Sequence, residues 1–329
     1  MALIDFAIEH LPNDESAALA VPIPDLAHRV LALYWPQVRP FAGRELRQSA
    51  TARARIPQAA LDLRALAGVG AAGTSLEVVR HRVPDGYAQA VDEVTLCLAQ
   101  QPLHRLQRLP GAPAGDWFLY DDSYLHDHVS RKVLRAHGDA IFLIPGVASA
   151  LARLAGLLKP ALEIMWVEDV RRLNKYLDDD VPDVAGHLFG RERTSLRPVR
   201  APLREAFGPG CFYCGARLAR DHPIDHVLPW SLVGIDGLAN LVQSCQRCNT
   251  DKRHSLPALS IIDRVLARDR AVLEKIAQEL NWPSQYDRVV SAARGIYRVQ
   301  PDGGPTWAGV GKHYQLDLSY PSWWLSIES

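Results

Sequence analysis

The sequence lacks a net charge, a long uncharged hydrophobic run and the high cysteine content of small secreted domains. Its 37 basic and 37 acidic side chains cancel, which argues against a protein coated in basic residues for indiscriminate nucleic-acid binding. Five cysteines in 329 residues exclude a small disulfide scaffold, and 48% hydrophobic residues exclude a wholly disordered chain. At about 100–200 residues per domain, the length predicts two or three domains.

No segment of the sequence is typical of a membrane span. The most apolar stretch, residues 141–166, is interrupted by two prolines and three charged residues: Pro145, Arg153, Lys159, Pro160 and Glu163. It falls short of the roughly 18–20 uncharged residues that a span needs, so we predict buried helices there. Residues 1–10 contain two acidic residues and no basic segment, which argues against a signal peptide. We expect a cytoplasmic protein with no membrane contact.

Hydrophobic periodicity predicts a mainly α protein. Apolar residues recur at helical spacing in several stretches: 23–35, 59–66, 76–83, 126–136, 146–158 and 164–177. Residues 86–99 fit either a helix or a strand. Further along, residues 256–280 predict one long helix closed by Pro283, and residues 285–297 predict another.

Composition divides the chain into three predicted regions. Residues 1–200 form a helical region of unassigned role, with a candidate linker rich in Gly and Pro at 110–116 and a solvated acidic run at 178–180. A separate module covers residues 201–256. Residues 257–329 are expected to pack on the rest through helices and an aromatic tail, whose anchors are Trp307, Tyr314, Tyr320, Trp323 and Trp324.

Four of the five cysteines form two Cys-x2-Cys pairs, Cys211 with Cys214 and Cys245 with Cys248. In a cytosolic chain such pairs predict a tetrahedral zinc site rather than disulfides. The 30 residues between the pairs exceed the ~15–20 of a simple zinc ribbon, so a folded element must occupy the interval. Cys97 lies in an apolar run and is predicted to be a buried small hydrophobe.

The interval contains an Asp225-His226 pair beside apolar residues, which is typical of a strand edge. Successive side chains of a strand point to opposite faces, so one residue can face a metal and the other a reacting water. A second pair, Asp221-His222, precedes a proline, and we expect His222 to lie in a solvent-exposed loop. Only the first pair is followed, fourteen residues after the histidine, by Asn240 leading into the second cysteine pair.

Residues 208–254, about one seventh of the chain, resemble the HNH endonuclease family of ββα-metal nucleases in its zinc-bearing form. Asp225-His226 matches the first motif histidine and the ligand before it, Asn240 matches the middle asparagine, and Asn249 stands at the third position. Many members have histidine there, so this sequence is an H-N-N variant. The resemblance implies a small zinc-stabilised ββα module in the C-terminal half: two antiparallel strands, a loop over residues 228–239, and a helix from near Gln246.

The resemblance also implies roles for individual residues. His226 would act as general base, while Asp225 and Asn249 would hold a catalytic Mg²⁺ or Mn²⁺; an amide ligand at the third position favours Mg²⁺. Asn240 would fix the loop and the orientation of His226. Three residues beyond the motif are candidates for phosphate contacts: Lys252, Arg253 and His254.

The local charge fits a nucleic-acid partner. Residues 191–254 contain ten Lys or Arg against six Asp or Glu, a surplus of four positive charges hidden by the neutral total. We predict a metal-dependent endonuclease that cuts DNA, with antiviral defence as the expected role from contexts common in the family. Alternatives are a non-catalytic zinc-stapled nucleic-acid-binding module and a nuclease directed at RNA. The helical region would then dock a protein partner or a second copy.

Overall fold

The computed structural model describes all residues except 15, 42, 50–53, 70–73, 112–116, 176, 178–183, 190–195, 320–321 and 326–329. The predicted acidic run and most of the predicted linker lie outside the described residues. Within the described part the chain is mainly helical, as predicted, with three two-stranded sheets. None of its helices there is both long and apolar enough to cross a membrane.

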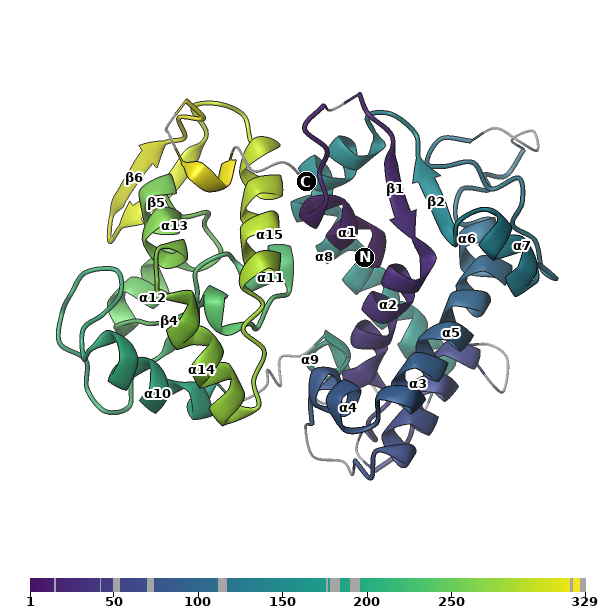
Figure 1. Ribbon diagram of the computed structural model, residues 1–329, viewed down its shortest axis with the longest axis horizontal. Coiled ribbons are helices and arrows are strands. Elements are labelled where there is room, and N and C mark those ends of the chain that lie inside the picture. Colours follow the sequence, from purple (N-terminus) through teal and green to yellow (C-terminus); the bar gives the residue numbers. More distant parts are fainter. Residues whose placement is uncertain are drawn as a thin grey trace. The chain divides into compact units, whose positions relative to one another are not determined.

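The chain divides into two compact units (Figure 1). Unit 1 comprises Met1–Phe6, Asp14–Ala148 and Leu157–Thr194, and unit 2 comprises Ala7–Asn13, Ser149–Gly156 and Ser195–Ser329. Helices α1 (Ala2–Glu9) and α8 (Val147–Leu173) contribute residues to both units.

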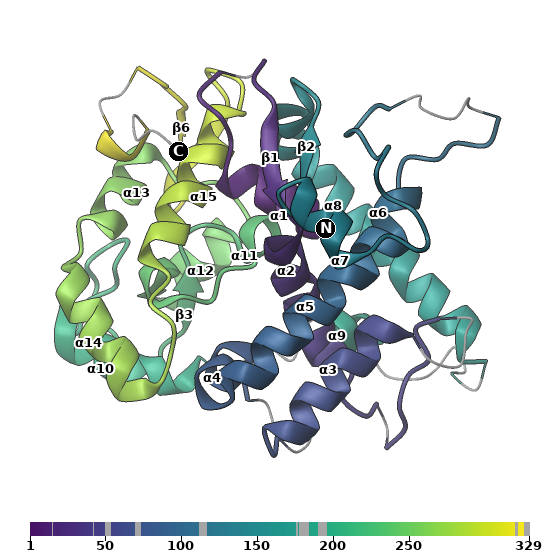
Figure 2. The same ribbon diagram turned by 45° about the vertical axis from the view of Figure 1, so that its right-hand side comes forward.

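Unit 1 is built around helix α5 (Pro84–Gln100), against which α2 (Ile23–Gln37) and α3 (Arg55–Leu66) pack (Figures 1 and 2). Buried apolar side chains such as Leu31, Val94 and Leu98 fill this core. Strands β1 and β2 pair antiparallel, with Val21 opposite Ile141. The other elements are β1 (Leu19–Pro22), α4 (Leu76–Arg82), α6 (Pro102–Arg105), α7 (Arg131–Ala136), β2 (Ala140–Leu143) and α9 (Val184–Phe189).

Helix boundaries in unit 1 differ from the sequence expectation where caps intervene. The pattern over residues 126–136 becomes a helix only at Arg131, because the Ser130 side chain accepts a hydrogen bond from the Val133 amide and caps the helix there. Residues 86–99 form a helix, not a strand. The two patterns on either side of Pro160 form a single helix, α8. Cys97 is buried, as predicted.

Unit 2 contains four longer helices: α10 (Arg197–Phe207), α13 (Leu259–Leu266), α14 (Arg270–Leu280) and α15 (Tyr286–Arg298). The single helix predicted over residues 256–280 is wrong, because α13 ends at Leu266 and α14 begins at Arg270. The Asp269 carboxylate accepts hydrogen bonds from the amides of Ala271 and Val272 and so starts a new helix. Gly295 permits close packing on α15, since a Cβ there would lie 1.7 Å from the carbonyl oxygen of Ile8.

A hairpin of β5 (Pro305–Gly309) and β6 (Lys312–Gln315), followed by η2 (Trp323–Leu325), forms the C-terminal part of unit 2. Trp307 and Trp324 are completely buried, which confirms them as packing anchors. Tyr314 and Trp323 are 59% and 49% exposed, so the same prediction is wrong for them. Tyr314 is exposed because β6 buries neither of its faces: all four of its residues, Lys312–Gln315, are exposed. Tyr320 lies outside the described residues.

Candidate active site and metal centre

The site is built on a short antiparallel sheet followed by a helix. Strand β3 (Ile224–His226) pairs with β4 (Leu241–Gln243), with His226 opposite Leu241. Helix α12 (Gln246–Lys252) begins three residues after β4 ends. The connection between the strands carries α11 (Trp230–Val233) and η1 (Leu238–Asn240). This is the predicted ββα arrangement, with the helix starting at the expected residue.

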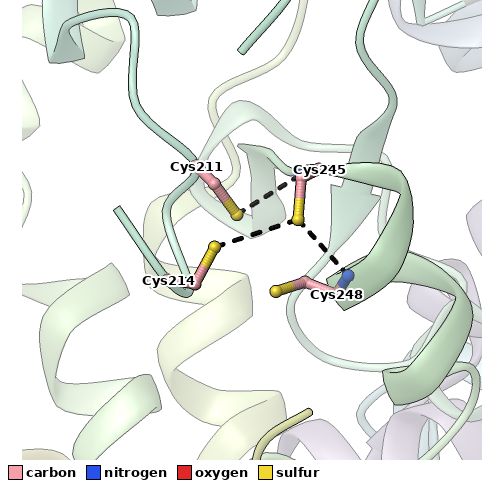
Figure 3. A group of neighbouring side chains, drawn as sticks. All are labelled: Cys211, Cys214, Cys245 and Cys248. Carbon is pink, nitrogen blue, oxygen red and sulfur yellow. Dashed lines mark hydrogen bonds between the residues drawn. The ribbon is translucent and has the colours of Figure 1, made fainter. Parts of the chain in front are cut away.

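The four paired cysteines converge at one end of this element (Figure 3). Their sulfur atoms lie within 4.8 Å of one another, and the Sγ atoms of Cys214 and Cys245 are 3.8 Å apart. Cys211 and Cys214 come from a tight turn closed by Gly215, whose φ of 75° favours glycine. Cys245 caps α12 and Cys248 lies in its first turn.

The chemistry of this cluster fits zinc. Four thiols at mutual contact distance match the tetrahedral sulfur set of structural zinc sites. Burial raises the pKa values of the Cys211 and Cys248 thiols, so without a cation the cluster is costly to ionise. Burial also raises the pKa of Cys245, but hydrogen bonds from Cys248 and the neighbouring thiols outweigh it and lower that pKa overall. Bound zinc would favour the thiolates and clamp the turn to α12.

Asp225 is held by two partners, the partly buried Tyr213 and the buried Lys252. The Tyr213 hydroxyl donates to its Oδ2 atom at 2.6 Å, and the Lys252 Nζ atom lies 3.2 Å from the same oxygen. The same ammonium donates to the main-chain oxygen of His226 at 2.7 Å. Because Tyr213 lies between the first two cysteines, it connects the zinc cluster to Asp225.

Lys252 does not lie where the sequence expectation placed it. Its side chain is completely buried, whereas a phosphate contact requires an accessible ammonium. Burial lowers the pKa of Lys252, and the Asp225 carboxylate partly offsets that effect. In this structure Lys252 contacts Asp225 and His226, which sequence reasoning did not foresee.

His226 pairs with a carboxylate that the sequence did not reveal. Its Nε2 atom lies 2.7 Å from Oδ1 of Asp236, ten residues later in the loop between the strands. An ionised carboxylate only accepts hydrogen bonds, so this contact places the proton on Nε2 and leaves the lone pair on Nδ1. The ring is buried, with 4% exposure. The sequence does show an acidic residue, Asp236, in this loop, but its spacing from His226 does not identify it as the partner of that histidine.

The loop that carries Asp236 is fixed from two sides. The completely buried Asn240 side chain accepts from the Leu228 amide at 2.8 Å and donates to the carbonyls of Leu228 and Ile235, both at 3.1 Å. The Trp282 indole donates to the Asp236 carbonyl at 2.8 Å. A side chain at Gly237 would collide with Ser284 and Gln285, so glycine is required there.

A partly buried arginine completes this support. Arg268 donates to the carbonyl oxygens of Leu238, Ala239 and Leu241 at 3.1, 2.7 and 2.8 Å. Burial lowers the pKa of Arg268 to about 10, which still leaves it charged at neutral pH. The guanidinium therefore ties the end of the loop to the start of β4.

Asn249 lies three residues before Lys252 on α12, so the two side chains share one helix face. Because Lys252 contacts Asp225, Asn249 is placed on the side of α12 that faces the end of β3. Within the described residues, neither the side-chain amide of Asn249 nor the Oδ1 atom of Asp225 has a hydrogen-bond partner. A carboxylate and an amide oxygen in an incomplete protein cage fit Mg²⁺ or Mn²⁺.

The remaining candidates lie around this centre. Arg253 and His254 are exposed at the end of α12, and the Arg253 Nε atom donates to the Thr250 carbonyl at 3.2 Å. His222 was expected in an exposed loop, and that expectation is wrong. The residue is 3% exposed, and its Nδ1 atom lies 2.9 Å from the Ala219 carbonyl oxygen, whereas its buried Nε2 atom has no hydrogen-bond partner within the described residues.

Residues 211–255 match the HNH endonuclease family. This segment is an HNH endonuclease domain. It contains the four cysteines together with Asp225, His226, Asn240 and Asn249, which confirms the resemblance seen in the sequence. No curated protein and no solved structure matches the chain. The HNH domain indicates a nuclease, and thus a hydrolase that binds nucleic acid.

Proposed function

We propose that the chain is a metal-dependent endonuclease that hydrolyses DNA phosphodiester bonds through its HNH domain. The observation that carries the proposal is the contact of His226 Nε2 with Asp236, next to Asp225 on the same strand. The contact leaves one imidazole nitrogen basic, and adjacent strand residues point to opposite faces. A base and a metal ligand are therefore available from consecutive positions.

His226 Nδ1 is the proposed general base. It takes a proton from the attacking water, whose oxygen forms the new bond to phosphorus while the bond to the leaving 3′ oxygen breaks. Asp236 orients the ring and stabilises the imidazolium as it forms, as a carboxylate does in other acid–base pairs. Asn240 holds the loop so that Asp236 keeps this position.

Asp225 and Asn249 are the proposed protein ligands of the catalytic ion. Mg²⁺ or Mn²⁺ bound there would supply positive charge to the phosphate and to the leaving oxygen. Arg253 and His254 remain proposed phosphate contacts. For Lys252 we propose a different role, in which it holds Asp225 and His226 from inside the protein.

The positive surplus around the motif supports a nucleic-acid backbone as partner, and we propose DNA rather than RNA. Residues 201–256 would be the catalytic module, residues 257–329 its packing support, and residues 1–200 a helical region that docks a partner or a second copy. A cytoplasmic role in antiviral defence is the biological setting that we propose for this arrangement.

The test is a matrix of substrates and metals. Purified chain is incubated with supercoiled plasmid, linear duplex, single-stranded DNA and RNA, each with Mg²⁺, Mn²⁺ or EDTA. We expect cleavage of duplex DNA with either ion and none with EDTA. Asp236→Asn should lower the rate by about 10–100-fold and leave zinc content unchanged. Cleavage of RNA alone would contradict the proposed substrate.

One observation favours a non-catalytic alternative. His226 is 4% exposed, so water reaches its ring poorly in this state of the protein. A zinc-stapled module that binds nucleic acid without cutting would retain the same contacts. Binding of duplex DNA with no product under any metal would favour this alternative over the nuclease.

A further inference from the structure

One oxygen of Asp225 is already occupied inside the protein, so a metal can use only the other. Oδ2 accepts the Tyr213 hydroxyl at 2.6 Å and lies 3.2 Å from Lys252 Nζ. The Lys252 side chain is completely buried, and the Asp225 side chain is 11% exposed. Away from bulk water, opposite charges at this distance interact strongly. The carboxylate therefore faces the metal position with much of its charge compensated.

The second proposed ligand does not restore the missing charge. Asn249 is a neutral amide, and Asp236 is engaged by His226 Nε2 instead. Mg²⁺ is commonly held by one or two carboxylates together with substrate phosphates, and it gives up its water reluctantly. A single compensated carboxylate and an amide thus make a weak site until phosphate oxygens arrive.

We propose that Lys252 and Tyr213 are positioning residues that make metal binding depend on nucleic acid. This inference rests on the proposed nuclease function. The free protein binds the ion weakly, and a backbone phosphate supplies the negative charge that Lys252 has cancelled. Because Lys252 also binds the His226 carbonyl at 2.7 Å, one side chain fixes both the ligand and the base.

If Lys252 acts through its charge, removing it should tighten Mn²⁺ binding. If it acted only as a structural support, removing it should weaken Mn²⁺ binding. Lys252→Met removes the ammonium and leaves Asp225 uncompensated, so Mn²⁺ becomes the best available countercharge. We expect the variant without nucleic acid to bind Mn²⁺ at least about tenfold more tightly than the wild type, and to gain more in melting temperature on Mn²⁺ addition. Its cleavage rate should nevertheless fall, because Asp225 and His226 lose their common support.

The experiment uses the full zinc-loaded chain and measures Mn²⁺ affinity by calorimetry and electron paramagnetic resonance. His226→Ala, in which we expect cleavage to be slowed, is titrated with and without duplex DNA, and we expect at least about tenfold tighter Mn²⁺ binding with the duplex. Lys275→Met is the charge-matched control, since its ammonium is 77% exposed and near Glu279. It should leave Mn²⁺ affinity unchanged.

Tyr213→Phe keeps the ring and removes the hydroxyl, and should tighten Mn²⁺ binding by about two- to threefold. Zinc content and circular dichroism show whether Lys252→Met folds. If it does not, the Mn²⁺ affinity of Tyr213→Phe tests the inference instead. Equal Mn²⁺ affinity with and without duplex, or weaker Mn²⁺ binding in these variants, would overturn the inference. If the wild type still cleaves in that case, the nuclease function stands. Absence of cleavage with every metal would overturn the function itself.

Discussion

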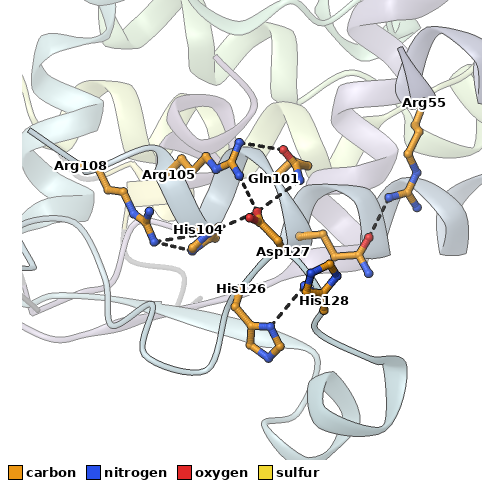
Figure 4. Close-up of polar contacts among 9 residues, drawn as sticks. Arg55, Gln101, His104, Arg105, Arg108, His126, Asp127 and His128 are labelled. Carbon is orange, nitrogen blue, oxygen red and sulfur yellow. Dashed lines mark hydrogen bonds and ion pairs between the residues drawn. The ribbon is translucent and has the colours of Figure 1, made fainter. Parts of the chain in front are cut away.

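A cluster of aspartate, histidine and cationic side chains in unit 1 differs in burial from the cluster of the same residue types in unit 2. In unit 1, Asp127 lies between His126 and His128 and contacts Arg105 at 2.6 Å (Figure 4). In unit 2, Asp225 precedes His226 and contacts Lys252. The Asp127 side chain is 43% exposed and that of Arg105 is 49% exposed, whereas the Lys252 side chain is completely buried. Similar residue types therefore lie in very different environments.

The two clusters differ in geometry rather than in composition, and the geometry of the unit 2 cluster is the one that suits the proposed catalysis. Exposed ion pairs such as Asp127–Arg105 are weakened by water and contribute little. Within the described part of the chain, the His126 ring accepts a main-chain hydrogen bond from the His128 amide at 3.2 Å, and the buried His104 lies 3.5 Å from Asp127. His226 has a closer carboxylate partner, at 2.7 Å, and its strand neighbour Asp225 is held by the buried Lys252 and the partly buried Tyr213. Such fixed surroundings would hold the proposed base and the proposed metal ligand in one geometry.

The largest expected effect comes from breaking the zinc cluster. Cys248→Ser removes one ligand at the start of α12, and structural zinc contributes roughly 10 kcal/mol or more to the folding of small metal domains. We expect zinc content to fall to near zero and the HNH domain to become sensitive to protease. Metal analysis and limited proteolysis check this. Cys97→Ser, in unit 1, should retain zinc; normal zinc content in Cys248→Ser would refute the site.

The next effect concerns the loop that positions Asp236. Asn240→Ala leaves the Leu228 amide and two carbonyls without their partner in a fully buried place. We expect a loss of about 2–4 kcal/mol in the free energy of unfolding, measured with urea. Gln246→Ala, on the exposed face of α12, should change it by less than about 0.5 kcal/mol. Equal values for the two variants would mean that the loop does not depend on Asn240.

A smaller effect is expected in the exposed cluster of unit 1. Asp127→Asn weakens the contact with Arg105, and exposed pairs of this kind contribute at most about 1 kcal/mol. Unfolding in urea should therefore change little, and DNA cleavage should be unaffected. A cleavage defect in Asp127→Asn would remove the distinction between the two clusters and assign a functional role to unit 1.

The smallest effect tests how the C-terminal hairpin attaches to α12. The Trp307 indole, and then the Gly311 amide, donate to Asp251 and hold its pKa below the ordinary value of 3.8. The folded protein therefore favours the charged form of Asp251. The Asp251 carboxylate stabilises the folded state fully above pH 3.8, and this contribution disappears as the pH falls through the lowered pKa. Asp251→Asn should reduce the melting temperature slightly at neutral pH. The difference from wild type should shrink in acid; a difference that grows would contradict the assignment.

The sequence predicts the module well because its information is local. Cysteine spacing places the zinc ligands, and the Asp225-His226 pair, Asn240 and Asn249 appear in order along one short segment. The helix from Gln246 follows from the same pattern. Features that depend on contacts across the fold could not be predicted in this way. Whether Lys252 is exposed depends on how α12 packs behind β3, and the pairing of Asp236 with His226 depends on a loop held by Trp282 and Gly237.

Helix boundaries show the same limit. Periodicity located most helices, but the ends of α7 and α14 depend on the Ser130 and Asp269 caps, which override a continuous apolar pattern. His222 shows a further limit, since a histidine beside proline is buried here with its ring nitrogen against the Ala219 carbonyl. Burial is a property of the packed structure, so residue type alone does not determine it.

The most direct test of the central claim is a single-turnover measurement of plasmid cleavage in Mn²⁺ by wild type, His226→Ala and His222→Ala. The two histidines lie four residues apart, both are buried, and only His226 contacts Asp236. The account predicts that His226→Ala loses about 10²–10⁴-fold in rate while retaining zinc and fold, and that His222→Ala cleaves within a few-fold of wild type. An undiminished rate in His226→Ala would contradict the assignment of the general base.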